Sequence, residues 1–255
     1  MVRAPAWAPP LLAVQFLTRL PVPVLARLTP EQAADGLARA MAWLPPVGTL
    51  IGSATAAAFV VAGQWWPPLL AALLALALEA LLTGAFHEDA VADFCDAFGG
   101  TARGEAALRI MRDSRIGSYG ALGLGLAVAM RVAAIVALPS ALAVAAIVAA
   151  ATLARLCAIL LAAILPPAQA DGAAARMGSG MPPRRVALAL LLAAPGLVPL
   201  AILRPTALLA ALVAIAVLLA WLARFLRARI GGSTGDCLGF AAYMAQLLVL
   251  LAAAA

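Results

Sequence analysis

Acidic side chains gather in the short stretch FHEDAVADFCDAFGG, residues 86–100. Asp89, Asp93 and Asp96 follow one another at spacings of four and three residues, so on a helix they share one face. Like charges on one helical face repel one another, and a bound divalent cation would offset that repulsion. Ligands that are all oxygen favour Mg²⁺, Mn²⁺ or Ca²⁺ over zinc. The stretch therefore predicts a metal site, with Glu88 as a further ligand; the alternative is a solvated acidic surface.

A second polar stretch, RIMRDSRIGSYGALGLG, carries three arginines just before an apolar run. Arg109, Arg112 and Arg115 can form a phosphate-binding group, because a guanidinium matches phosphate oxygens with two parallel hydrogen bonds.

A third polar stretch, RARIGGSTGDCLG, is rich in glycine and leads into the last apolar run. Glycine lets backbone amides approach an anion closely, and an amide-rich turn at a helix N-terminus suits phosphate, although the spacing matches no P-loop. Asp236 enters this run, where it either joins the acidic cluster or caps the last helix. Acidic ligands, an arginine group and a glycine-rich turn together indicate a site for a diphosphate substrate and a metal ion.

The composition shows where these stretches must lie. The chain has 255 residues, of which 66% are hydrophobic and only 11% charged, and its mean hydropathy is +1.07. Soluble domains carry about 25% charged residues, so this is an integral membrane protein. Apolar and polar residues do not alternate as they would in a membrane barrel. We therefore expect an all-α, polytopic helical bundle that forms a single membrane domain over residues 1–255.

Apolar runs predict about seven membrane-spanning helices, judged against the roughly 20 residues that a span needs. Prolines and Arg19 break up the apolar start of the chain, so residues 1–46 are expected to lie at the membrane interface or in the cytoplasm. The expected spans are 47–63, 66–86, 117–138, 141–165, 186–203, 206–226 and 238–255.

Arginine is distributed unevenly between the connections. The long polar segments are separated by pairs of spans and therefore face one side of the membrane; they are 1–46, 87–116, 166–185 and 227–237. Most arginines, Arg176 among them, lie in or beside these segments, whereas only Arg204 lies on the other side. By the positive-inside rule the long segments, and with them the site, are cytoplasmic, as in a multi-pass protein of a bacterial inner membrane. The arginines of these cytoplasmic segments also explain the pI near 10.5, so the high pI does not indicate nucleic-acid binding.

Three ionisable residues fall inside the expected spans. Glu79, Arg131 and Arg155 are costly in lipid and should face the interior of the bundle, for function or as structural pairs. The alternative is that their side chains extend to the membrane interface.

The three polar stretches together resemble the cobalamin synthase family, the adenosylcobinamide-GDP ribazoletransferases. The resemblance rests on GAFHEDAVADFCDAFGG, IMRDSRIGSYGALGL and RIGGSTGDCLGF, and on FLTRLPVP and PPVGTLIG nearer the start. It covers nearly the whole chain. It implies a Mg²⁺-dependent membrane enzyme that joins adenosylcobinamide-GDP to α-ribazole or its 5′-phosphate and releases GMP. The resemblance leaves open whether the protein forms a homo-oligomer.

The resemblance also implies roles for individual residues. Asp89, Asp93 and Asp96 would bind the metal, although residue 90 is alanine in this sequence and is often glycine in the family. Arg115, with Arg112, would hold the leaving phosphate, and Asp96 or Asp236 would accept the hydroxyl proton. His87, the sole histidine, is either a catalyst or a structural residue. The remaining residues matched to substrate- or phosphate-binding elements are Asp113, Ser114, Gly231, Gly232, Thr234 and Gly235.

Two other functions compete with this interpretation. CDP-alcohol phosphotransferases also place spaced aspartates on membrane helices, but their usual pattern has an arginine that DFCDAFGG lacks. An ion-coupled transporter would carry its acids near mid-membrane and often shows repeats. In this sequence the acids lie at the end of a span, and no repeat is visible.

Overall fold

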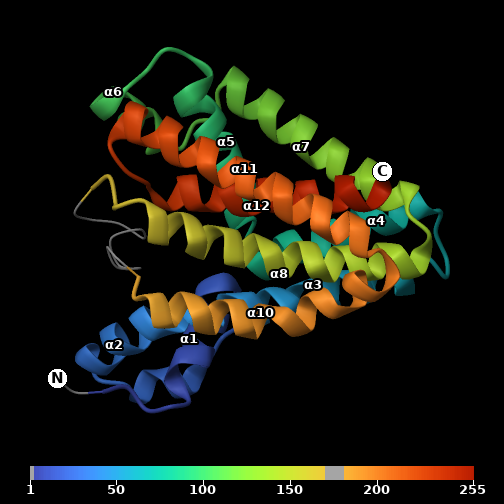
Figure 1. The fold of residues 1–255 in the computed structure, drawn as a ribbon, viewed down its shortest axis with the longest axis horizontal. Helices are drawn as coiled ribbons and strands as arrows, with labels where there is room; N and C mark the ends of the chain where they lie inside the picture. Colours follow the sequence, from blue (N-terminus) through green and yellow to red (C-terminus); the bar gives the residue numbers. More distant parts are fainter. Residues whose placement is uncertain (1–2, 170–180) are drawn as a thin grey trace.

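Long apolar helices run side by side through the computed structural model, which describes residues 3–169 and 181–255 (Figure 1). Within those residues, six helices are long and apolar enough to cross a membrane, and α4 with α5 adds a seventh if the pair is one broken span. The predicted all-α membrane bundle is confirmed. The six are α3 (Leu44–Ala62), α7 (Ser118–Ala137), α8 (Ser140–Ile164), α10 (Pro183–Leu203), α11 (Pro205–Ile230) and α12 (Gly235–Ala254). Helix α3 continues from α2 (Pro30–Ala40).

The connections separate into two groups at opposite ends of the bundle. The short turns from α3 to α4, from α7 to α8 and from α10 to α11 lie at one end, on the right of Figure 1. Helix α2, the short helix α6 (Gly104–Met111) and the start of α12 lie at the other end. This is the arrangement that the sequence predicts for its long polar segments. Arg176, in one of those segments, lies outside the described residues.

Helix α8 lies at the centre of the bundle. It packs against α3, α10 and α12, and small residues allow the close approach. Gly48 of α3, for example, faces the Ala151 carbonyl and the aliphatic part of Arg155, and a β-carbon there would collide with that carbonyl. A glycine at this position therefore lets α3 pack closely against α8 where Arg155 lies.

The second expected span ends in a sharp bend. Helix α4 (Pro68–Thr83) ends at Gly84, and α5 (Phe86–Gly99) sets off at 90° to it. Gly84 (φ 76°) and Ala85 (φ 57°) both adopt the left-handed conformation, which is rare for a residue with a β-carbon. Helix α5 thus turns away from the direction of the spans and packs against α7 and α12. The bend therefore turns the acidic stretch away from the axis of α4.

The N-terminal region packs beside α3. Helix α1 (Ala8–Leu17) has 10 residues, so at about 1.5 Å per residue it is too short to cross a membrane. Two 3₁₀ turns, Pro23–Arg27 and Met41–Trp43, flank α2.

Candidate active site

Carboxylates crowd together where α5 meets the first turn of α12. Asp89 is exposed and Asp93 is half-buried. Neither carboxylate accepts a hydrogen bond from a described residue. Partial burial, followed by the nearby charges of Asp89, Asp236 and Asp96, raises the pKa of Asp93 to about 6. The fold therefore brings Asp236 to the acidic stretch, although four spans separate the two in sequence.

Asp96 differs from its neighbours because it joins two helices. Its carboxylate accepts hydrogen bonds from the backbone amides of Gly117, at 2.6 Å, and Gly120, at 2.8 Å. These amides lie at the start of α7 and have no partner within their own helix, so Asp96 acts as the cap of α7. A β-carbon at Gly120 would collide with this carboxylate. Each oxygen keeps a second lone pair, so the metal and catalytic roles of Asp96 stay predictions.

Glu88 points away from the other acids and into the bundle. Its carboxylate lies 3.6 Å from Arg131 of α7, which also pairs with Glu79 of α4 at 2.7 Å. Glu79 further accepts hydrogen bonds from Thr55 of α3, at 3.0 Å, and from Gln246 of α12, at 3.3 Å. Five helices therefore meet at one buried cluster of charges. The prediction that Glu79 and Arg131 face the interior is confirmed, and Glu88 has a structural partner in addition to its predicted metal role.

The start of α12 is capped by Thr234, whose hydroxyl accepts a hydrogen bond from the Cys237 amide at 3.3 Å. Asp236 is therefore not the N-cap, although it lies in the first turn of α12, where a negative charge favours the helix dipole. Thr234, which the sequence assigned to substrate binding, has this structural role as well.

The glycine-rich turn is fastened to the chain that follows α8. The Ser233 amide donates to the Pro166 carbonyl at 2.9 Å, and the Ala168 amide donates to the Ser233 carbonyl at 2.8 Å. Gly232 packs against this segment so closely that a β-carbon would collide with it. Gly231 ends α11 in the left-handed conformation (φ 75°) that glycine favours. These contacts shape the turn, and phosphate binding by Gly231, Gly232 and Gly235 stays a prediction.

The arginine group lies on the surface beside the start of α7. Arg115 binds its neighbour Asp113 through Nη2, at 2.6 Å, and through Nε, at 3.0 Å. This partnership lowers the pKa of Asp113 to about 2. Arg112 and Ser114 are exposed beside the pair. Arg115 keeps further N–H donors beside those that bind Asp113, and the roles predicted for these residues stay predictions.

His87 is buried at the first turn of α5, where its ring meets the edge of Phe86. Burial and the charges of Arg155 and Arg131 lower the pKa of His87 well below its ordinary value, so the imidazole is neutral. Of the two roles predicted for His87, a buried neutral side chain fits the structural role more simply than the role of an exposed acid catalyst.

Arg229 is a residue of the site that sequence reasoning missed. It donates to the carbonyls of Phe98, at 3.3 Å, and Gly100, at 3.1 Å, and its guanidinium lies over the ring of Phe225. It thereby joins the end of α11 to the end of α5, where a cation also favours the helix dipole. In the sequence, only the position of Arg229 beside the glycine-rich turn could have indicated that it belongs to the site.

The acidic cluster fits a hard cation by its chemistry, because its donors are all carboxylate oxygens. In residues 3–169 and 181–255, no group of three or more His, Cys, Asp or Glu side chains is placed so that it could hold a metal ion by itself. Mg²⁺ seldom needs such a group, since one or two carboxylates and substrate phosphates commonly hold it. Asp89, Asp93 and Asp236 are the candidates, because α5 packs against α12, the charges of Asp89 and Asp236 both act on Asp93, and none of the three forms an ion pair with a described residue.

Comparison with known proteins covers nearly the whole chain. Residues 9–254 match the family described as cobalamin-5-phosphate synthase. An adenosylcobinamide-GDP ribazoletransferase of Bradyrhizobium diazoefficiens is 40% identical, over 96% of this chain and 92% of its own length. Proteins of the same name from Ralstonia nicotianae (39% identical, 94% of this chain and 92% of the relative) and Rhizobium etli (41%, 95% and 94%) are equally similar. No solved structure matches the chain. The chain belongs to the cobalamin-5-phosphate synthase family.

Proposed function

We propose that this protein is a Mg²⁺-dependent adenosylcobinamide-GDP ribazoletransferase of the bacterial inner membrane, with its site on the cytoplasmic side. The observation that carries the proposal is the full-length similarity to proteins of that name, together with the meeting of the acidic stretch and the start of α12. The family match favours neither a CDP-alcohol phosphotransferase nor a transporter.

The reaction is a phosphoryl transfer, in which the protein mainly positions groups and stabilises charge. The ribose 3′-hydroxyl of α-ribazole, or of its 5′-phosphate, attacks the phosphorus on the cobinamide side, and GMP leaves with the bridging oxygen. Mg²⁺, when bound, neutralises charge on the diphosphate oxygens. Asp89, Asp93 and Asp236 are the residues that would hold it.

The other residues of the site would bind substrate or move a proton. Asp236 is better placed than Asp96 to accept the hydroxyl proton, because both oxygens of Asp96 already accept backbone hydrogen bonds. Arg112 directly follows α6, Arg115 lies in the connection from α6 to α7, and both would hold the departing phosphate.

Product analysis tests the proposal against its two rivals. The purified protein in lipid should release GMP only when adenosylcobinamide-GDP and α-ribazole are both present with Mg²⁺. Release of CMP from a CDP-alcohol would instead identify a CDP-alcohol phosphotransferase. Ion flux into vesicles without GMP release would identify a transporter.

A further inference from the structure

Arg131 of α7 is a buried cation that contacts both sides of the bend between α4 and α5. Only 3% of its surface is exposed. Its Nη2 lies 2.7 Å from a carboxylate oxygen of Glu79 on α4, and its Nη1 lies 3.6 Å from one of Glu88 on α5. Glu79 precedes the bend at Gly84 and Ala85, and Glu88 follows it. One guanidinium therefore joins the two helices across the bend.

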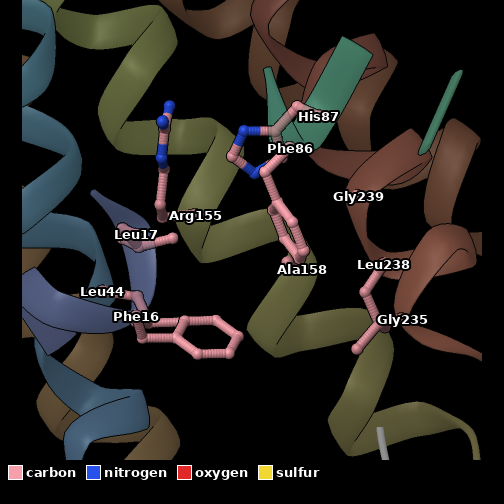
Figure 2. A pocket seen from close by; sticks show the side chains of 10 residues that line it. All are labelled: Phe16, Leu17, Leu44, Phe86, His87, Arg155, Ala158, Gly235, Leu238 and Gly239. Carbon is pink, nitrogen blue, oxygen red and sulfur yellow. The ribbon is translucent and has the colours of Figure 1, made fainter. Parts of the chain in front are cut away.

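The bend needs such contacts because its backbone is unfavourable by itself. Ala85 adopts the left-handed conformation, which crowds its β-carbon, and such a residue persists only where its surroundings hold it. Helix α1 supplies one contact, because Phe16 meets Phe86, the first residue of α5, edge to face with 6.0 Å between the ring centroids. Both rings line the pocket that Figure 2 shows. Arg131 adds the contact from α7.

The charges around Arg131 also reach α12, the helix that carries Asp236. Cζ of Arg131 lies 5.5 Å from the centre of the Tyr243 ring, within the range of a cation–π interaction, and the Gln246 side chain donates to Glu79 at 3.3 Å. Asp236, Tyr243 and Gln246 are spaced by seven and three residues, so they share one face of α12. The face of α12 that bears Asp236 is therefore fixed to the same cation that holds α5.

Helices α5 and α12 approach each other closely beside the acidic cluster. A β-carbon at Gly239 of α12 would lie 2.5 Å from the β-carbon of Ala90 on α5, so this spacing requires glycine at residue 239. Ala90 follows Asp89 in the sequence, and Gly239 lies one turn after Asp236. A change in the direction of α5 would therefore change the distances between the carboxylates of the site.

We propose that Arg131 is a positioning residue of the active site: by joining α4 to α5 across the bend, it directs α5 so that the carboxylates of that helix lie beside Asp236. The inference rests on the proposed function for the reaction that the carboxylates serve, whereas the direction of α5 can be tested without substrate. The simpler alternative is that Arg131 only neutralises the buried Glu79, so that it stabilises the whole bundle without a particular effect on α5.

Hydrogen–deuterium exchange of the full-length protein in lipid nanodiscs tests this role without turnover. Arg131→Lys keeps a charge beside Glu79, but a single ammonium does not reproduce the forked guanidinium that also reaches Glu88. The amides of α5 should therefore exchange at least about tenfold faster than in wild type, while those of α10 and α11 exchange as before. Arg204→Lys is the matched control and should leave α5 unchanged, because Arg204 lies at the other end of the bundle and donates to the Ala253 carbonyl at 3.1 Å.

Glu88→Gln provides a second variant if Arg131→Lys fails to fold. It leaves the pair of Arg131 and Glu79 intact and removes only the charge on α5, so faster exchange should be confined to α5. Wild-type exchange of α5 in either folded variant, or an increase spread evenly over the bundle, would overturn the positioning role.

The maximal rate of GMP release connects the direction of α5 with the reaction. Arg131→Lys should lower this rate at least about tenfold, because small displacements of positioned groups are costly in catalysis, whereas Arg204→Lys should not. A wild-type rate in a variant whose α5 exchanges faster would also overturn the positioning role. If the wild-type protein releases no GMP, the proposed function fails, and the exchange results still decide whether Arg131 directs α5.

Discussion

Asp96 of α5 accepts a hydrogen bond from the backbone amide of Gly117, the residue that precedes α7, at 2.6 Å. The sequence places these residues in two different polar stretches, and the structure joins them. One carboxylate of the acidic stretch therefore holds the second polar stretch in place, whereas Asp89 and Asp93 remain available for a ligand.

Asp96→Asn should destabilise the protein by about 1–2 kcal/mol, because a neutral amide offers α7 one acceptor in place of two charged ones. Thermal unfolding in detergent measures the change. Asp89→Asn is the matched control and should unfold like wild type, since Asp89 accepts no side-chain hydrogen bond from a described residue. Equal unfolding temperatures for Asp96→Asn and wild type would show that the cap contributes little.

Asp89→Asn and Asp93→Asn should each raise the Mg²⁺ concentration for half-maximal activity at least about tenfold, because each removes a charged oxygen ligand without changing size. GMP formation at a series of Mg²⁺ concentrations measures this. Asp35→Asn serves as the control, because Asp35 pairs with Arg39 on α2, away from the site. Near-normal turnover of both site variants at low Mg²⁺ would remove these residues from the metal site.

Glu88→Gln distinguishes a metal ligand from a positioning residue. Because Glu88 faces Arg131, the variant should lower the maximal rate several-fold and leave the Mg²⁺ requirement unchanged. A Mg²⁺ requirement that rises as in Asp89→Asn would instead support the ligand role that the sequence predicts.

Asp236→Asn should lower activity at least about tenfold and raise the Mg²⁺ concentration for half-maximal activity, while α12 stays folded because Thr234 already caps that helix. GMP formation and circular dichroism of the purified variant measure the two effects. Wild-type activity with wild-type Mg²⁺ dependence would mean that the acidic stretch and the start of α12 do not form one site.

The orientation of the bundle can be tested with fusions. An alkaline phosphatase reporter, active only outside the cytoplasm, should be active after Ala255 and inactive after Arg103, because the arginine-rich connections lie at the end of the bundle opposite the C-terminus. The reverse pattern would invert the proposed topology.

The sequence predicts the spans well because each is an unbroken apolar run, and α7 and α8 begin and end within about two residues of expectation. The second span was expected over 66–86, and α4 covers Pro68–Thr83 of it, but the sequence does not predict the bend at its end. The apolar run continues through Ala85 and Phe86, so hydropathy does not reveal the 90° bend, which depends on the packing of α5 against α7 and α12.

The site was predictable in its residue types and only partly in its contacts. The spacing of Asp89 and Asp93 is local, and an even number of spans returns Asp236 to the same end. The partners of Asp96, Glu88 and Arg229 lie 21 to 131 residues away, and such contacts leave no pattern in a single sequence.

The most direct measurement of the central claim is the stoichiometry of one reaction. Purified protein in lipid vesicles, supplied with adenosylcobinamide-GDP, α-ribazole and a low concentration of Mg²⁺, should form one GMP for each molecule of the joined cobalamin product, and Asp93→Asn should form far less of both. GMP without the joined product, or no GMP from a folded protein with both substrates, would contradict the account.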